Sequence, residues 1–326
     1  MLVLAAALAL LVADPGQTAV PPPVASQTAA QSTAQTTAQT DPSGPTSLED
    51  VVVTGRPLME MINQFVEQVS APARNRGLAR WRGGVCVSVV NLRPTTARYM
   101  VDRISARAME LGLRPGEPGC QPNVVVIATV DANALTREFV ASRPRMFRVG
   151  GAGMDRGGAA FARFQTNDQP VRWWNVSMPA QRDTGQRATR IPGDGDGGGV
   201  MGYAPNIHVF AASRLHTEIV DDMVRSFVII DMDRVGAVNF QQLADYVAMV
   251  SLTQVDPTAD TSRYASILNV FDDPEGAAGL TDWDRAYLEG LYGAERSLSD
   301  HDSYLREVAG SIGRAHDRIQ SGPATD

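Results

Sequence analysis

Histidine and cysteine are the residue types in this sequence best suited to bind a metal ion, and both are few. The chain of 326 residues has two cysteines and four histidines, namely His208, His216, His301 and His316. No two histidines show the HxH or HxxxH spacing that brings two imidazoles onto one metal ion, and the cysteines form no CxxC motif. The sequence therefore predicts neither a metal site nor a bound cofactor.

Two acidic segments imitate known site motifs without completing them. The tripeptide DTG at 183–185 occurs in aspartic proteases, where two aspartates share a proton, but here polar residues precede it instead of an apolar strand. The segment GDGDGGG at 193–199 resembles the start of a calcium loop, yet Pro205 stands where the loop needs a bidentate glutamate. Both segments are therefore expected to be loops.

The net charge of the chain is −7, which gives no electrostatic reason to expect nucleic acid or an anionic membrane as a partner. Residues 1–19 form a signal-like apolar segment that is too short to cross a membrane with normal margins. This segment predicts a periplasmic or secreted protein without a transmembrane domain in its mature form. The alternative is an uncleaved helix that tethers the chain to a membrane. Basic residues normally precede such a segment, and their lack leaves open whether the true start lies upstream.

Residues 20–47 are rich in Ala, Thr, Gln and Pro and have almost no charge, which predicts a disordered linker. The next segment, EDVVVTG at 49–55, resembles the N-terminal stretch of TonB-dependent outer-membrane receptors. That resemblance implies a TonB-like contact through Glu49, Val51, Val52 and Val53, with strand addition as its mechanism. The alternatives are a simple edge strand and an extended linker.

Residues 48–320 are expected to form a single α/β domain with a mixed, partly parallel sheet, followed by a tail at 321–326. After a first amphipathic helix at 58–69, strands and helices alternate in four segments: 85–92, 94–113, 123–130 and 131–141. A right-handed crossover would make the two strands parallel neighbours.

The two cysteines, Cys86 and Cys120, then lie at the same end of these adjacent strands. A disulfide between them would close a loop of about 35 residues and contribute roughly 3–4 kcal/mol. The alternative is two separate buried thiols.

Residues 144–203 read as a long irregular insertion that is interrupted by one strand at 171–178. Two β-rich runs follow at 211–220 and 223–232, and they predict an antiparallel hairpin with residues 227–230 in the core.

A helix beginning at Asn239 is expected to be the buried centre of the domain. Asn239 can cap it together with Gln242, and apolar residues cover it nearly all round. An apolar segment at 266–271 and two helices, 281–292 and 299–319, complete the chain.

The stretch from residue 239 to residue 292 resembles uncharacterised envelope proteins of proteobacteria that are similar to degenerate zinc metallopeptidases of the zincin type. The matching features are the turn at 255–257, the segment SILNVF at 266–271, and the pattern LTxxDxxxLxxLY at 280–292. The resemblance implies a zincin-like fold in which the central helix would carry an HExxH motif.

The residues at the motif's positions cannot perform zinc chemistry. The resemblance places Asp245 and Met249 where the two histidines would stand, and Tyr246 where the catalytic glutamate would stand. The third ligand would fall at Val255 or Asp256. A thioether cannot replace an imidazole on zinc, and a phenol cannot replace the water-activating carboxylate. The resemblance thus implies a non-catalytic binding or scaffold module whose partner is an envelope protein or a peptide.

A hydrolase with a different site is the alternative hypothesis. Its candidate residues are His208, His216, Asp245 and Asp256, which the hairpin and the central helix would have to bring together. The missing zinc ligands favour a protein without enzymatic activity. The geometry of these four side chains distinguishes the two hypotheses.

Overall fold

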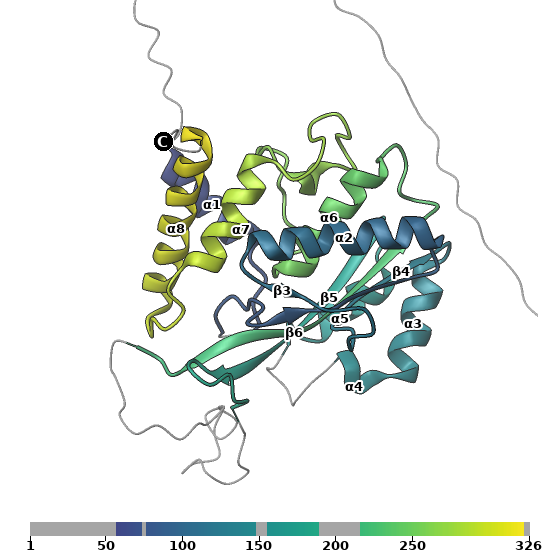
Figure 1. Cartoon of the computed structure of the whole chain (residues 1–326), viewed down its shortest axis with the longest axis horizontal. Coiled ribbons are helices and arrows are strands. Elements are labelled where there is room, and N and C mark those ends of the chain that lie inside the picture. The colour runs from purple at the N-terminus through teal and green to yellow at the C-terminus, as the bar shows by residue number, and fades with distance from the viewer. Residues whose placement is uncertain (1–56, 74–75, 148–154, 189–215, 323–326) are drawn as a thin grey trace, which may run out of the picture. The chain divides into compact units, whose positions relative to one another are not determined.

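A computed structural model describes residues 57–73, 76–147, 155–188 and 216–322 of the chain (Figure 1). These residues belong to one compact unit that covers residues 54–326. The predicted signal-like segment, the linker and the TonB-like stretch with Glu49 and Val51 to Val53 lie outside the described residues. His208, the segment at 193–199 and most of the tail at 321–326 also lie outside them.

The domain is built on a four-stranded sheet, and the mixed, partly parallel sheet expected from the sequence is confirmed. The spatial order is β2-β4-β6-β5. The strands are β2 (Val87–Val90), β4 (Val124–Thr129), β5 (Val171–Gln181) and β6 (Ile219–Asp231). β2, β4 and β6 run parallel, and β5 is antiparallel to β6 at the edge. Two short parallel strands, β1 (Gly84–Val85) and β3 (Arg114–Pro115), form a separate pair.

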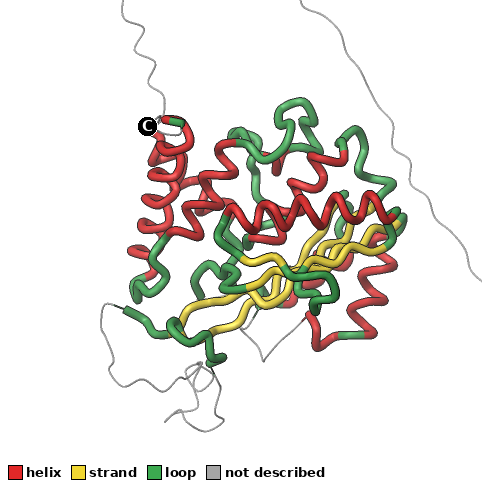
Figure 2. The backbone as a smooth tube through the Cα atoms, viewed as in Figure 1, coloured by secondary structure: helices red, strands yellow, loops and turns green. Residues whose placement is uncertain are grey.

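Helices cover both faces of the sheet (Figures 1 and 2). One face carries α2 (Pro94–Glu110) and α6 (Phe240–Leu252), and the other carries α3 (Ala132–Ser142), α4 (Pro144–Phe147) and α5 (Gly158–Thr166). Because side chains alternate along a strand, β6 divides its apolar residues between two cores. Val228 and Ile230 join the larger core with α6, whereas Phe227 and Ile229 join the smaller core with α3 and α5.

The predicted hairpin at 211–220 and 223–232 is wrong, because β6 is one strand of 13 residues that begins at Ile219 and continues through the expected break at Asp221 and Asp222. Residues 211–215 of the first expected arm lie outside the described residues. Asp221 and Asp222 do not break the strand, since arginines neutralise their carboxylates. Asp221 pairs with Arg76, and Asp222 accepts from Arg82 at 2.5 Å and from Arg296 at 2.6 Å. The antiparallel partner of β6 is β5, which precedes it in the sequence.

The segment at 144–203 is less irregular than expected, because its described part contains α4, α5 and the whole of β5. Apolar side chains explain this order. Phe147 and Phe164 are buried, and they pack with Trp174 of β5 in the smaller core. Trp174 also donates a hydrogen bond to the carbonyl oxygen of Phe147 at 2.7 Å.

The central helix α6 begins as predicted. The side chain of Asn239 accepts a hydrogen bond from the backbone N–H of Gln242, and the Gln242 side chain accepts one from the backbone of Asn239. Every residue from Gln242 to Leu252 is buried. The helix is therefore the centre of the larger core, as its apolar circumference indicates.

The segment after α6 is held by one buried carboxylate. Asp284 lies in the first turn of α7 (Asp282–Gly293). Its carboxylate accepts hydrogen bonds from the Ser266 hydroxyl at 2.6 Å and from the Ile267 N–H at 2.8 Å. It also accepts the backbone N–H and the hydroxyl of Thr281 at 3.0 and 2.9 Å. These bonds attach the short 3-10 helix Ile267–Asn269 to α7. The serine, threonine and aspartate of the sequence pattern thus have a structural role here.

The last helix, α8 (His301–Ser321), packs against α7 and against α1 (Leu58–Val69). Gly290 allows the close approach of α7 and α8, because a Cβ at this position would lie 2.4 Å from the Cα of Ile312. No helix in the described ranges is both long enough and apolar enough to cross a membrane.

The predicted disulfide is present, and the Cα atoms of Cys86 and Cys120 lie 6.1 Å apart. The geometry agrees with the expected crossover, because Cys86 immediately precedes β2 and Cys120 lies just before β4. The side chain of Asn123 supports this corner by accepting the N–H of Cys86 at 2.8 Å.

Candidate functional site

Asp245 holds α2 and α6 together. Its carboxylate has no exposed surface and accepts hydrogen bonds from Arg103 at 2.8 and 2.7 Å and from Arg107 at 3.2 Å. A fourth bond comes from the backbone N–H of Leu280 at 3.0 Å. A Cβ on Gly279 would lie only 2.5 Å from this carboxylate. The helix position where the resemblance places a first zinc ligand is therefore occupied by a fully bonded structural carboxylate.

The charges around Asp245 keep it ionised. Burial alone would raise the pKa of this carboxyl, but the hydrogen bonds from Arg103, from the Leu280 N–H and from Arg107 outweigh burial and leave the pKa below its ordinary value. A carboxylate with two arginine partners and a lowered pKa is poorly suited to act as a general base at neutral pH.

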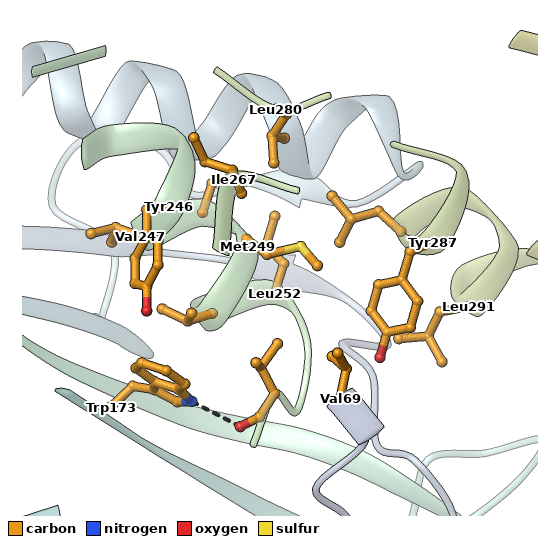
Figure 3. Close-up of a cluster of buried hydrophobic side chains, with 14 of the residues drawn as sticks. Val69, Trp173, Tyr246, Val247, Met249, Leu252, Ile267, Leu280, Tyr287 and Leu291 are labelled. Atoms are coloured by element: carbon orange, nitrogen blue, oxygen red, sulfur yellow. Dashed lines mark hydrogen bonds between the residues drawn. The ribbon is translucent and has the colours of Figure 1, made fainter. Parts of the chain in front are cut away.

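Met249, where the resemblance places the second histidine, is completely buried. It projects from α6 into a cluster of apolar side chains that includes Ile267, Leu280 and Tyr287 (Figure 3). No group of three or more His, Cys, Asp or Glu side chains within the described ranges could hold a metal ion.

Tyr246, where the resemblance places the catalytic glutamate, faces a cavity. Its side chain is 7% exposed and lies on the side of α6 that faces Trp173 (Figure 3). Burial, followed by the negative charge of Asp272, raises the pKa of this phenol, so that the hydroxyl stays protonated. Within the residues that the structure describes, the hydroxyl has no hydrogen-bond partner.

The cavity has a volume of about 410 Å³ and lies between the start of β5, helix α6 and the loop that follows α6. Its wall is largely apolar and aromatic, and it includes Val171, Trp173, Tyr246, Leu268 and Phe271, which are buried or half-buried. Its rim carries three aspartates, Asp256, Asp260 and Asp272. An apolar hollow with a few polar groups at its mouth is the usual form of a ligand site.

Among the candidate hydrolase residues that the structure describes, Asp256 alone lines this cavity. Its carboxylate pairs with Arg156 at 2.6 Å and accepts hydrogen bonds from the N–H and the hydroxyl of Thr258 at 2.8 and 2.7 Å. Its backbone N–H donates to the carbonyl oxygen of Val69 at 2.7 Å. Asp256 therefore shapes the loop after α6 as well as the rim.

The structure does not bring the other candidates to the same place. His216 has its Nδ1 atom 2.9 Å from the Ser297 hydroxyl, and its backbone pairs with Leu298. Asp245 is turned towards α2, and neither His216 nor Asp245 lines the cavity. His208 lies outside the described residues. The three described candidates are thus held by three different sets of partners.

Sequence reasoning did not single out most of the cavity. Trp173 belongs to the pair of tryptophans on β5, whose alternation predicts opposite faces, but not which face carries a hollow. Phe271 and Asp272 follow the 3-10 helix, and no motif of the sequence distinguishes them. Gln169 and Asp260 come from loops whose positions depend on the tertiary structure.

Comparisons of this chain with protein-family models, with curated proteins and with solved structures give no match. The candidate site is therefore defined by the residues of this chain alone, without a relative for comparison.

Proposed function

We propose that this protein is a non-catalytic binding module of the bacterial envelope and that the cavity beside Tyr246 is its ligand site. One observation carries the proposal. Of the three positions on α6 where a related peptidase would keep its catalytic groups, Asp245 and Met249 are completely buried in the domain. The third, Tyr246, also lines an open hollow, and its hydroxyl has no partner among the described residues.

The chemistry of the cavity supports binding without catalysis. A hydrolytic site needs a nucleophile or a water molecule next to a general base. Tyr246 is a protonated phenol, and Arg156 already engages the carboxylate of Asp256. The alternative of a hydrolase built from His208, His216, Asp245 and Asp256 has no supporting geometry among the described residues.

The size of the cavity supports a ligand no larger than a small molecule or one to two side chains of a peptide. Ligand sites in proteins commonly have volumes of about 300–1,000 Å³, and this cavity is near the lower end of that range. We therefore propose a peptide segment of an envelope protein as the partner, with one side chain inserted between α6 and β5.

The location in the envelope rests on two features. Disulfides persist in oxidising compartments, and Cys86 and Cys120 are bonded. The apolar segment at 1–19 is typical of export signals. The resemblance to degenerate zincins is part of this proposal, and the order of elements, β-α-β-α followed by two strands and a long helix, supports it.

The test is selection from a displayed random-peptide library on the full chain. Ala259 is half-buried and lines the cavity, so Ala259→Trp should fill it, whereas Ala278→Trp adds the same ring at an exposed position outside it. Selected peptides should bind Ala259→Trp at least tenfold more weakly and Ala278→Trp with unchanged affinity. Thermal melting would establish that both variants are folded. Equal binding to both variants would place the site elsewhere and overturn the proposal.

The TonB-like contact remains a separate prediction, since residues 49–55 lie outside the described ranges. Deleting these residues should abolish pull-down by the C-terminal domain of TonB. Unchanged pull-down would refute the contact without affecting the proposed cavity site.

A further inference from the structure

We infer that the cavity recognises an organic cation, the guanidinium or ammonium group of an arginine or lysine side chain on the partner peptide. This inference rests on the proposed function and specifies its ligand. Three independent properties of the wall lead to it: its charge, its aromatic faces and the balance of its hydrogen-bonding groups.

The charged side chains that line the cavity are all acidic. The residues that line the cavity include three aspartates and no lysine, arginine or histidine. Arg156 neutralises Asp256, but neither Asp260 nor Asp272 forms an ion pair with any residue that the structure describes. Hydrogen bonds from Ser262 lower the pKa of Asp260, so this carboxylate is ionised at neutral pH. An anionic ligand would be repelled by this rim, whereas a cation would be attracted.

The floor of the cavity presents aromatic rings. Tyr246 packs edge-to-face against Trp173 at a centroid distance of 6.0 Å and against Phe271 at 4.9 Å. The Trp173 Nε1–H is already used, because it donates to the carbonyl oxygen of Val255 at 3.0 Å (Figure 3). The indole therefore offers only its ring to a ligand. Aromatic faces attract cations through the ring quadrupole, and the attraction is larger where water is excluded.

Apart from the Tyr246 hydroxyl, the side-chain donor groups of the wall make hydrogen bonds within the protein. The Gln169 amide N–H donates to the Pro257 carbonyl oxygen at 2.5 Å, and the Asn269 amide donates to the carbonyl oxygens of Thr261 and Tyr264. The Thr261 hydroxyl donates to the side-chain oxygen of Asn269 at 2.6 Å. The Ser262 hydroxyl likewise donates to a neighbouring carboxylate.

The groups that remain free are acceptors. The side-chain oxygen of Gln169 is buried and has no hydrogen-bond partner among the described residues. The Tyr246 hydroxyl is also without a partner there, and it can accept as well as donate. Ammonium and guanidinium groups are donors without acceptors, so they complement this wall. A buried acceptor without a partner is unfavourable, and a bound donor would satisfy it.

An organic cation fits better than a metal ion. The acidic side chains of the rim do not form, with any other residue that the structure describes, a group of three ligands that could hold a metal. The aromatic rings that make the floor favour a large, weakly hydrated cation such as guanidinium.

The test is isothermal titration calorimetry of the full chain with three amides of equal length: Nα-acetyl-arginine amide, Nα-acetyl-lysine amide and the neutral Nα-acetyl-citrulline amide. The arginine and lysine probes should bind in the millimolar range or tighter, and citrulline about tenfold more weakly than arginine. Added salt should weaken the binding of the two cations.

Four variants locate the binding. Asp260→Asn and Asp272→Asn should each weaken binding of the arginine probe by up to about fivefold, because each removes one exposed charge. Tyr246→Phe removes only a hydroxyl and should weaken it by about two- to tenfold. Asp233→Asn is the matched control, because Asp233 is exposed and does not line the cavity, and it should leave the affinity unchanged.

Citrulline binding as tightly as arginine would overturn the inference, and so would equal affinities of Asp260→Asn, Asp272→Asn and Asp233→Asn. The inference would also be overturned if neither the arginine probe nor the lysine probe bound. These results are separate from the proposed function, which stands or falls with the loss of selected peptides in Ala259→Trp. The two rim variants lie on the surface, so the test remains decisive even if Tyr246→Phe does not fold.

Discussion

Replacing Asp245 with asparagine should make the protein much easier to unfold, although the two side chains have almost the same size and shape. The substitution removes a buried negative charge that accepts three hydrogen bonds from two arginines and one from the backbone N–H of Leu280. The side chain of Arg107 is only 8% exposed, so its guanidinium would lose a buried partner. Breaking a buried ion pair from one side costs about 3–5 kcal/mol.

That loss is large compared with the total free energy of unfolding. Domains are stable by about 5–15 kcal/mol, and each kcal/mol corresponds to about 2–4 °C of melting temperature at this size. Asp245→Asn should therefore lower Tm by about 6–20 °C. Urea unfolding followed by circular dichroism measures the free energy of unfolding directly. The exposed Asp233→Asn is the control and should change it by less than about 0.5 kcal/mol.

The difference between the wild type and Asp245→Asn should depend on pH with a defined sign. The folded-state pKa of Asp245 is lower than its value in the unfolded chain, so the unfolded state binds more protons in the acid range. The stabilisation by this carboxylate is thus fully present above about pH 4, the ordinary aspartate pKa, and is lost as the pH falls through the folded-state value. The two proteins should converge in stability as the pH falls.

A decrease of less than about 1 kcal/mol in the free energy of unfolding at pH 7 would refute this reasoning, because it would mean that the hydrogen bonds from Arg103 and Arg107 contribute little. A different outcome would support the hydrolase alternative. If Asp245→Asn abolished a peptidase activity and left Tm unchanged, the carboxylate would have a chemical role rather than a structural one.

Three further predictions concern the disulfide, the packing of the last two helices and metal content. Replacing Cys86 and Cys120 together with serine should lower the free energy of unfolding by about 4 kcal/mol on the chain-entropy estimate, measured by urea unfolding, and no change would show that the bond does not form in solution. Gly290→Ala should cost about 1–3 kcal/mol despite the better helix propensity of alanine, because its Cβ would overlap α8. The control Gly310→Ala, which meets only the end of a flexible arginine side chain, should be neutral or stabilising by up to about 1 kcal/mol, and equal effects of the two would contradict the packing. Elemental analysis of the purified protein should find zinc well below one ion per chain, whereas one tightly held ion per chain would contradict the proposal of a metal-free module.

Much of the fold could be predicted because local physical rules determine it. Asn239 and Gln242 announce the start of α6, and Gly112, which has a φ of 75°, follows the end of α2 as glycine often does. The alternation of strand and helix from 85 to 141 predicted the parallel pair and hence the disulfide corner. These features depend on residues close together in the sequence or on a single crossover rule.

The errors arose where distant side chains decide the outcome. Asp221 and Asp222 looked like a break between two strands, and only the arginines at 76, 82 and 296 explain why the strand continues. Local rules found neither α5 nor the order of its segment, because the aromatic contacts that stabilise it come from β5 and β6.

The candidate site was predicted in part. The sequence singled out Asp245, Tyr246, Met249 and Asp256, but it could not distinguish the residues that support the core from those that line the hollow. Asp245 and Tyr246 are neighbours in the sequence, yet one faces α2 and the other faces β5, because successive residues of a helix point about 100° apart. The rest of the wall comes from β5, the 3-10 helix and separate loops, which only the folded chain brings together.

The central claim is that the cavity beside Tyr246 binds a peptide and performs no chemistry on it. Its most direct test is mass spectrometry of a random-peptide library after incubation with the full chain and with Ala259→Trp. We expect the native protein to retain a subset of peptides and every retained peptide to be recovered intact. Ala259→Trp should retain none of them. New peptide ends that accumulate with time in the presence of the native protein, but not with Ala259→Trp, would contradict it.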